Sequence, residues 1–188
     1  MLSVVTVLGS ARGDGNAARL LRAVTAGRRA RSFDLSALHI RDYVYGRAAD
    51  GDDFLTIAEA IAEAIADAEA VLFVTPVYWY AMSAPLKRFF DRLTDLVTVQ
   101  KPLGRRLAGR SVWVAACGSD PALPEGFEVP FRDTAAYFGM TYSGALYVSM
   151  REGEGLSPED EQRALAFGAD VYGALGRGAV DGPTSGAC

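Results

Sequence analysis

The sequence contains few residues of the types that bind metals. It has two cysteines, Cys117 and Cys188, and one histidine, His39, among 188 residues. A structural zinc site needs four such ligands, and a four-thiolate iron–sulfur cluster needs four cysteines. We therefore expect no metal site in the chain. The same scarcity excludes a disulfide framework, so a cytoplasmic location is expected.

The sequence also lacks a long apolar run and an excess of positive charge. The apolar run at residues 3–8 is too short to span a membrane, and no positively charged leader precedes it. The 23 acidic and 19 basic residues give a net charge of −4, which disfavours nucleic acid as a partner. Half of the residues are apolar. We expect one domain over residues 1–176 and a flexible, glycine-rich tail over 177–188.

Short apolar runs alternate with longer segments of helical periodicity. The short runs predict buried strands at residues 3–8, 30–35, 70–75, 111–116 and 140–148. Apolar residues at helical spacing predict helices at residues 16–26, 53–67, 83–96, 127–138 and 157–175. This alternation predicts an α/β fold: a flavodoxin-like, doubly wound, five-stranded parallel sheet in the order 2-1-3-4-5, with helices on both faces.

A glycine-rich segment at residues 9–17 joins the first predicted strand to the first helix. Sheets of this class bind ligands beyond the carboxyl ends of their strands, at the switch point between strands one and three. Ser10 and Asn16 offer side-chain donors there, and Arg12 offers a charged fork. A helix N-terminus beside them suits a phosphate, although a purely structural turn is an alternative. Neither the P-loop motif nor the G-x-G-x-x-G motif matches.

The segment after the third predicted strand contains three consecutive aromatic residues, Tyr78, Trp79 and Tyr80. We expect Pro76 to end the strand before them. Large rings in a loop expose apolar area unless they contact something. A flat, amphipathic ligand would explain them, and so would packing against the body of the protein or a second subunit.

A third motif follows and reads Ser83-Ala84-Pro85-Leu86-Lys87-x-Phe89-x-Asp91-Arg92. It joins two others, Gly9-Ser10-x-Arg12-x-x-Gly15-Asn16 and Thr75-Pro76-Val77-Tyr78-Trp79. In this order, the three motifs resemble the NADPH-dependent FMN reductase family of flavodoxin-like proteins, and most closely its iron–sulfur flavoprotein-like branch. The resemblance is close from the first strand through the third helix and extends to the rest of the chain by topology.

The resemblance implies an FMN site built from three loops. The implied FMN-binding residues are Ser10, Ala11, Arg12, Gly15, Asn16 and Ala17 around the phosphate, Pro76, Val77, Tyr78 and Trp79 along the ring, Ser83 at the next helix start, and Cys117, Gly118 and Ser119 on the other side of the ring. Ala17 stands where family members often have threonine, so its backbone N–H must suffice. The stretch 39–53, where the branch carries its cysteine cluster, has no cysteine. FMN is therefore the only expected redox centre.

The resemblance implies an FMN-dependent NAD(P)H oxidoreductase. NADPH or NADH would supply electrons, and the acceptor would be a quinone, a nitro or azo compound, or another flavin. Because the cofactor carries the chemistry, no catalytic side chain is assigned. Two alternatives are an electron carrier of the flavodoxin kind, against which the modest charge of −4 counts, and a flavin-binding regulatory module. We also expect a homodimer or higher homo-oligomer, formed through the third helix and the aromatic loop.

Overall fold

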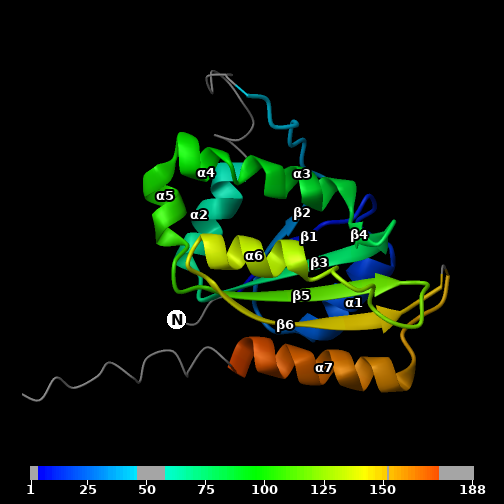
Figure 1. The fold of residues 1–188 in the computed structure, drawn as a ribbon. Coiled ribbons are helices and arrows are strands. Elements are labelled where there is room, and N and C mark those ends of the chain that lie inside the picture. The colour runs from blue at the N-terminus through cyan, green and yellow to red at the C-terminus, as the bar shows by residue number, and fades with distance from the viewer. Residues whose placement is uncertain (1–3, 46–57, 152, 174–188) are drawn as a thin grey trace, which may run out of the picture.

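The computed structural model describes residues 4–45, 58–151 and 153–173. Its centre is a parallel sheet in the order β2-β1-β3-β5-β6 (Figure 1). These strands are β1 (Val4–Leu8), β2 (Arg31–Asp34), β3 (Ala70–Tyr78), β5 (Ser111–Gly118) and β6 (Thr141–Ser149). The flavodoxin-like sheet predicted from the sequence is thereby confirmed, with β5 and β6 as its fourth and fifth parallel strands.

Helices cover both faces of the sheet (Figure 1). One face carries α1 (Asn16–Thr25) and α7 (Pro158–Gly173), and the other carries α2 (Glu59–Asp67), α3 (Ala84–Arg92), α4 (Asp95–Thr98), α5 (Lys101–Arg106) and α6 (Val129–Tyr137). Alternate strand residues point to opposite faces. Leu72 and Val74 accordingly pack in the cluster with α1 and α7, whereas Val71 and Phe73 pack in the cluster with α2, α3 and α6.

The prediction that Pro76 ends the third strand is wrong, because β3 continues to Tyr78. Pro76 pairs with Cys117 of β5. Gly9, just past the end of β1, donates its N–H to the carbonyl of Val74 at 2.8 Å. Residues two apart on a strand direct their backbone groups toward the same neighbouring strand. The nitrogen of Pro76 therefore points in the direction of β1, as the carbonyl of Val74 does, but β1 has already ended at this level. The sheet needs no donor there, and proline is tolerated.

Three short elements were not predicted. β4 (Ala81–Met82) pairs antiparallel with the end of β3. The predicted helix at residues 83–96 is interrupted after Arg92, and α4 and α5 follow as separate short helices. The predicted tail at 177–188 and residues 53–57 of the second predicted helix lie outside the described residues.

Candidate functional site

A hollow of about 270 Å³ lies at the carboxyl edge of the sheet, where the segments after β1, β3 and β5 meet. Its lining residues are Ser10, Arg12, Gly15, Asn16, Ala17, Pro76, Val77, Tyr78, Cys117, Gly118, Ser119 and Met150. All of the predicted site residues except Ala11, Trp79 and Ser83 are therefore brought together. Met150 was not predicted, because only the pairing of β6 with β5 places it beside this edge.

The first turn of α1 presents backbone donors to this hollow. Gly15 is the N-cap residue, and no side chain caps the helix. The hydroxyl of Ser10 accepts a hydrogen bond from the backbone N–H of Arg12 at 3.3 Å. The amide of Asn16 donates to the carbonyl of Arg151 at 3.1 Å and so ties α1 to the segment after β6. Uncapped N–H groups and the positive end of the helix dipole suit an anion.

Ser83 is fully buried and contacts the segment after β1 on the side away from the hollow. Its hydroxyl donates to the carbonyl of Gly9 at 2.6 Å and accepts from the N–H of Leu86 at 3.5 Å. Ser83 is therefore the N-cap residue of α3. A Cβ at Gly9 would lie 2.5 Å from the Cβ of Leu86, so the loop can approach α3 this closely only with glycine.

We expect Ser83→Ala to lower the free energy of unfolding by about 1–3 kcal/mol, because the buried carbonyl of Gly9 loses its donor. The affinity for FMN should fall as well, since the loop that carries Ser10 loses its support. Urea unfolding and FMN titration measure the two effects. Ser157→Ala is the matched control, because Ser157 accepts from the N–H of Asp160 at the start of α7. An unchanged FMN affinity in Ser83→Ala would contradict the supporting role.

The aromatic residues after Tyr78 form the turn of a hairpin. Tyr78 pairs with Ala81, and the two residues between them, Trp79 and Tyr80, have φ angles of 50° and 64°. Such turns favour asparagine and glycine, and bulky residues there are strained. Trp79 and Tyr80 are 93% and 69% exposed. The turn holds them beside a hollow of about 170 Å³, which shares Val77, Gly118 and Ser119 with the first one.

The third segment is fixed by hydrogen bonds to the end of β6. The hydroxyl of Tyr147 donates to the carbonyl of Asp120 at 2.8 Å, and the N–H of Met150 donates to the carbonyl of Gly118 at 2.7 Å. Burial, and secondarily the charge of Asp120, raises the pKa of Tyr147, which keeps its hydroxyl protonated as a donor. Residues 118–120 are therefore held at the mouth of the hollow.

Cys117 lines the hollow, yet its thiol is buried, and burial raises its pKa to about 12. We expect a Cys188→Ser variant, whose single thiol is Cys117, to react with a disulfide reagent at pH 8 about a thousandfold more slowly than a free thiol. The rate should rise with pH toward 12, because the thiolate is the reactive form. The same variant in urea is the control and should react at the ordinary rate. Rapid reaction of the folded variant would contradict a buried thiol.

The donors around the hollow fit a flat molecule that carries a phosphate. The uncapped α1 N-terminus, the Ser10 hydroxyl and the Arg12 guanidinium would hold the phosphate of FMN. The backbone of residues 76–78 and of 117–119 would line its ring. His39 is exposed and belongs to neither hollow. In the described part of the chain, no cluster of three metal-ligating side chains occurs, and none of the helices there could cross a membrane.

The sheet order and a ligand hollow at its switch point define a flavodoxin-like protein. Comparison with known proteins narrows this class: the model of the NADPH-dependent FMN reductase family matches residues 2–155. The chain belongs to this family. It is an oxidoreductase that uses FMN as its cofactor and NAD(P)H as its electron donor.

Individual relatives agree with this assignment. An FMN-dependent NADH:quinone oxidoreductase of Burkholderia thailandensis is 27% identical over 73% of this chain and 75% of its own length. Bacillus subtilis YwqN, named as an NAD(P)H-dependent FMN-containing oxidoreductase, is 28% identical over 85% of this chain and 88% of its own. The solved structure of the Trp repressor binding protein from Bacillus subtilis has a TM-score of 0.64 at 24% identity and shares the fold over 90% of this chain and 98% of its own.

Proposed function

We propose that this chain reduces quinones with electrons from NAD(P)H, at the hollow formed by the segments after β1, β3 and β5. FMN bound there supplies the two-electron chemistry, so that NAD(P)H is oxidised while the quinone gains two electrons and two protons. Nitro compounds, azo compounds and free flavin are the other acceptors that such a site admits. The quinone is favoured by the name of the Burkholderia relative.

The observation that carries the proposal is the pairing of two adjoining hollows with different chemistry. The first has the uncapped N-terminus of α1 on one side and the residues 76–78 and 117–119 on the other. The second lies under the exposed rings of Trp79 and Tyr80 and is bordered by Asp120. A flat acceptor that enters beside FMN would contact these rings, and aromatic stacking favours flat molecules.

Steady-state kinetics of the FMN-loaded protein test the proposal. NADH and NADPH are each offered with a benzoquinone, a nitrofuran, an azo dye and riboflavin under anaerobic conditions. We expect the highest kcat/KM with the quinone. Because Trp79 lines the second hollow and not the first, Trp79→Ala should raise KM for the quinone more strongly than it lowers the affinity for FMN, with Tyr137→Ala, an exposed aromatic residue that lines neither hollow, as the control. If riboflavin is the one acceptor of the four that is turned over, the choice of quinone is overturned. If NAD(P)H reduces the bound FMN but no acceptor is turned over, the protein is an electron carrier or a regulatory module.

We further propose that the chain forms a homodimer through α3 and the aromatic hairpin. Tyr78, Trp79 and Tyr80 are three consecutive aromatic residues that are all exposed, and exposed large apolar side chains that lie together are typical of a contact site. Light scattering at micromolar concentration is expected to give twice the chain mass, and a Trp79→Glu/Tyr80→Glu variant should shift the mass toward the monomer. A monomeric mass for the unaltered protein would contradict this proposal and leave the enzymatic one intact.

A further inference from the structure

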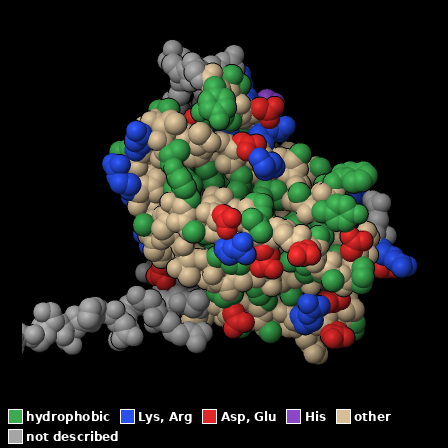
Figure 2. Space-filling view, viewed as in Figure 1, with side chains coloured by type: hydrophobic (Ala, Val, Ile, Leu, Met, Phe, Trp, Pro, Cys, Tyr) green, Lys and Arg blue, Asp and Glu red, His purple; other side chains and the backbone are tan. Residues whose placement is uncertain are grey.

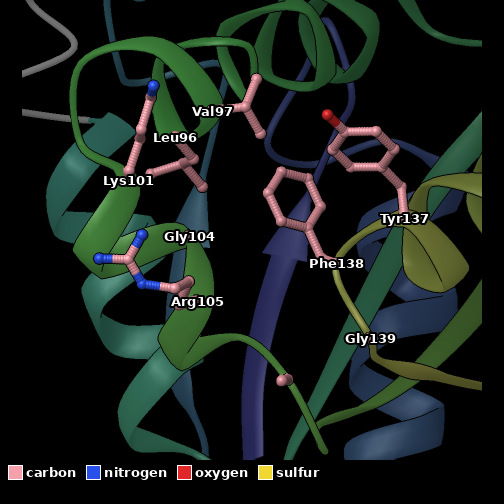
Figure 3. A pocket seen from close by; sticks show the side chains of 9 residues that line it. Leu96, Val97, Lys101, Gly104, Arg105, Tyr137, Phe138 and Gly139 are labelled. Atoms are coloured by element: carbon pink, nitrogen blue, oxygen red, sulfur yellow. The ribbon is translucent and has the colours of Figure 1, made fainter.

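A third hollow, of about 500 Å³, is separate from the 270 Å³ hollow that we assign to FMN and call the flavin hollow. Its lining residues are Leu96, Val97, Lys101, Gly104, Arg105, Ala108, Tyr137, Phe138 and Gly139. Ala108 and Gly139 come shortly before β5 and β6 begin, whereas the flavin hollow lies where the strands end. The two hollows therefore belong to opposite edges of the sheet. Figure 3 shows Leu96 and Val97 on one side of this hollow and the rings of Tyr137 and Phe138 on the other.

The hollow continues along α6 as a groove. An adjoining hollow of about 450 Å³ shares Val97, Tyr137 and Phe138 with it and extends toward Val129 and Phe90. On the face viewed in Figure 2, apolar side chains gather in the depression between α6 and the helices α3 to α5. We call the two hollows together the α5–α6 groove.

The local backbone builds this groove. A Cβ on Gly104 would collide with the carbonyl oxygen of Leu96, so glycine lets α5 fold back against α4. On the opposite side of the groove, the rings of Tyr137 and Phe138 pack edge to face, with their centroids 5.4 Å apart. Tyr137 is nevertheless 70% exposed. A large ring is thus held at the rim with most of its surface uncovered.

The charged side chains that line the 500 Å³ hollow are both cationic, whereas Asp133 lines the adjoining 450 Å³ hollow. Lys101 and Arg105 lie one turn apart on α5, an arrangement in which like charges repel. Among the described residues, the side chains of Lys101 and Arg105 form neither a hydrogen bond nor an ion pair. Their neighbour Arg106 differs, because it forms an ion pair with Asp67. No acidic side chain lines the 500 Å³ hollow within the described ranges. An anion at this rim would relieve the repulsion.

We propose that the α5–α6 groove binds an organic anion with an apolar body, such as an aromatic carboxylate or sulfonate. The apolar body would lie between Leu96, Val97 and Phe138, and the anionic group would face Lys101 and Arg105. A volume of about 500 Å³ lies within the range of small-molecule sites. The paired cations favour such a ligand over a neutral one, and the apolar lining favours it over inorganic phosphate.

Calorimetric titration of the FMN-loaded protein with anilinonaphthalene sulfonate tests the proposal. Phenyl-naphthylamine, which lacks the sulfonate, is the neutral comparison. We expect one molecule of the sulfonate to bind, and Lys101→Gln/Arg105→Gln to weaken it by about five- to tenfold. Arg106→Gln is the matched control on the same helix and should bind as the unaltered protein does. Ala108→Phe, which fills the hollow, should remove the binding of both probes.

Several results would contradict the proposed anion-binding site. One is equal affinity for the sulfonate in the double variant and the unaltered protein, and another is equal affinity for the neutral and anionic probes. A third is a dimer that Ala108→Phe converts to a monomer, because a second copy would then be the occupant of the groove. Unchanged FMN affinity and unchanged thermal unfolding of each variant separate these results from a loss of folding.

Discussion

Gly15→Asp is expected to lower the affinity for FMN by about a hundredfold or more, because charge-assisted hydrogen bonds to the phosphate are lost and a negative charge is added beside it. Gly15 is the N-cap residue of α1, with φ −74° and ψ −170°, a conformation that aspartate also adopts. A Cβ there would lie 3.7 Å from the Nε and Nη2 atoms of Arg12, which is ordinary contact. The new carboxylate would take the N–H groups and the cation that we assign to FMN.

The same substitution should stabilise the protein without FMN. Aspartate is a preferred N-cap, and its charge complements the helix dipole, so the free energy of unfolding should rise by about 0.3–1 kcal/mol. Affinity and stability thus change in opposite directions, which excludes misfolding as the cause of lost binding. FMN titration of the apoprotein and urea unfolding measure both.

Gly15→Asn is the matched control, because asparagine caps the helix without a charge. Its affinity for FMN should lie between those of the unaltered protein and Gly15→Asp. Unchanged FMN affinity in Gly15→Asp would show that the phosphate does not lie at the start of α1.

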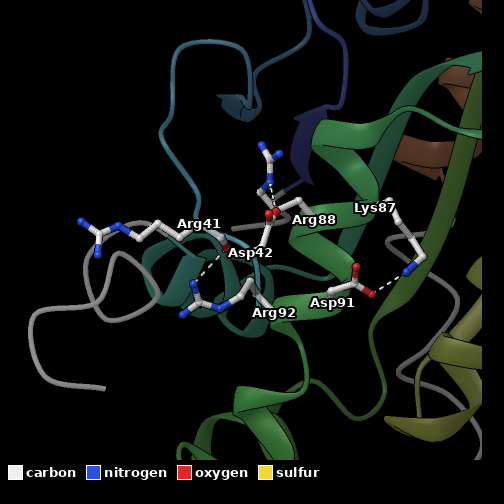
Figure 4. A network of polar contacts seen from close by, with 6 residues as sticks. All are labelled: Arg41, Asp42, Lys87, Arg88, Asp91 and Arg92. Carbon is white, nitrogen blue, oxygen red and sulfur yellow. Dashed lines mark hydrogen bonds and ion pairs between the residues drawn. The ribbon is translucent and has the colours of Figure 1, made fainter. Parts of the chain in front are cut away.

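Arg92→Ala is expected to lower the free energy of unfolding by about 3–5 kcal/mol, because it removes one partner of a buried ion pair. The side chain of Arg92 is 2% exposed; its Nε donates to the Oδ2 of Asp95 at 2.8 Å, and its Nη1 donates to the carbonyl of Arg41 at 3.1 Å. Figure 4 shows the hydrogen bond from Arg92 to the carbonyl of Arg41, which joins the end of α3 to the segment at residues 41–42. Thermal and urea unfolding measure the loss.

Arg88→Ala is the control for Arg92→Ala. Arg88 lies on the same helix as Arg92 and pairs with Asp42 at 2.6 Å (Figure 4), but the side chains of Arg88 and Asp42 are both exposed. Such a pair contributes less than about 1 kcal/mol. Arg92→Met keeps part of the buried apolar stem and should fall between the two, which provides a measurable variant if Arg92→Ala does not fold. Similar losses for Arg88→Ala and Arg92→Ala would contradict the buried role of Arg92.

Local patterns in the sequence were sufficient to predict the sheet. The runs at residues 4–8, 70–75 and 111–116 are apolar because these central strands are covered by helices on both faces. Ser83 could be recognised as a helix cap, because capping involves only its immediate neighbours. The three loops that meet at the flavin hollow could also be predicted, since parallel strands bring their carboxyl ends to one edge. The role of these residues in FMN binding stays a prediction.

Other features depend on contacts between distant parts of the chain. β4 is only two residues long and has no periodicity of its own, and Met150 reaches the hollow only through the pairing of β5 with β6. The left-handed turn at Trp79 and Tyr80 contradicts local preference, so only the hairpin that encloses it could reveal it.

The scarcity of cysteine and histidine alone predicted that the chain has no four-ligand metal site, and the sequence motifs indicated FMN as the redox centre. The tertiary structure determined the features that no local sequence pattern predicts. The hydroxyl of Ser83 supports the carbonyl of Gly9, and Lys101 and Arg105 border an apolar groove. The physical reason is range. Propensity, capping and periodicity act over a few residues, whereas burial and cavity shape arise only when segments separated in sequence pack together.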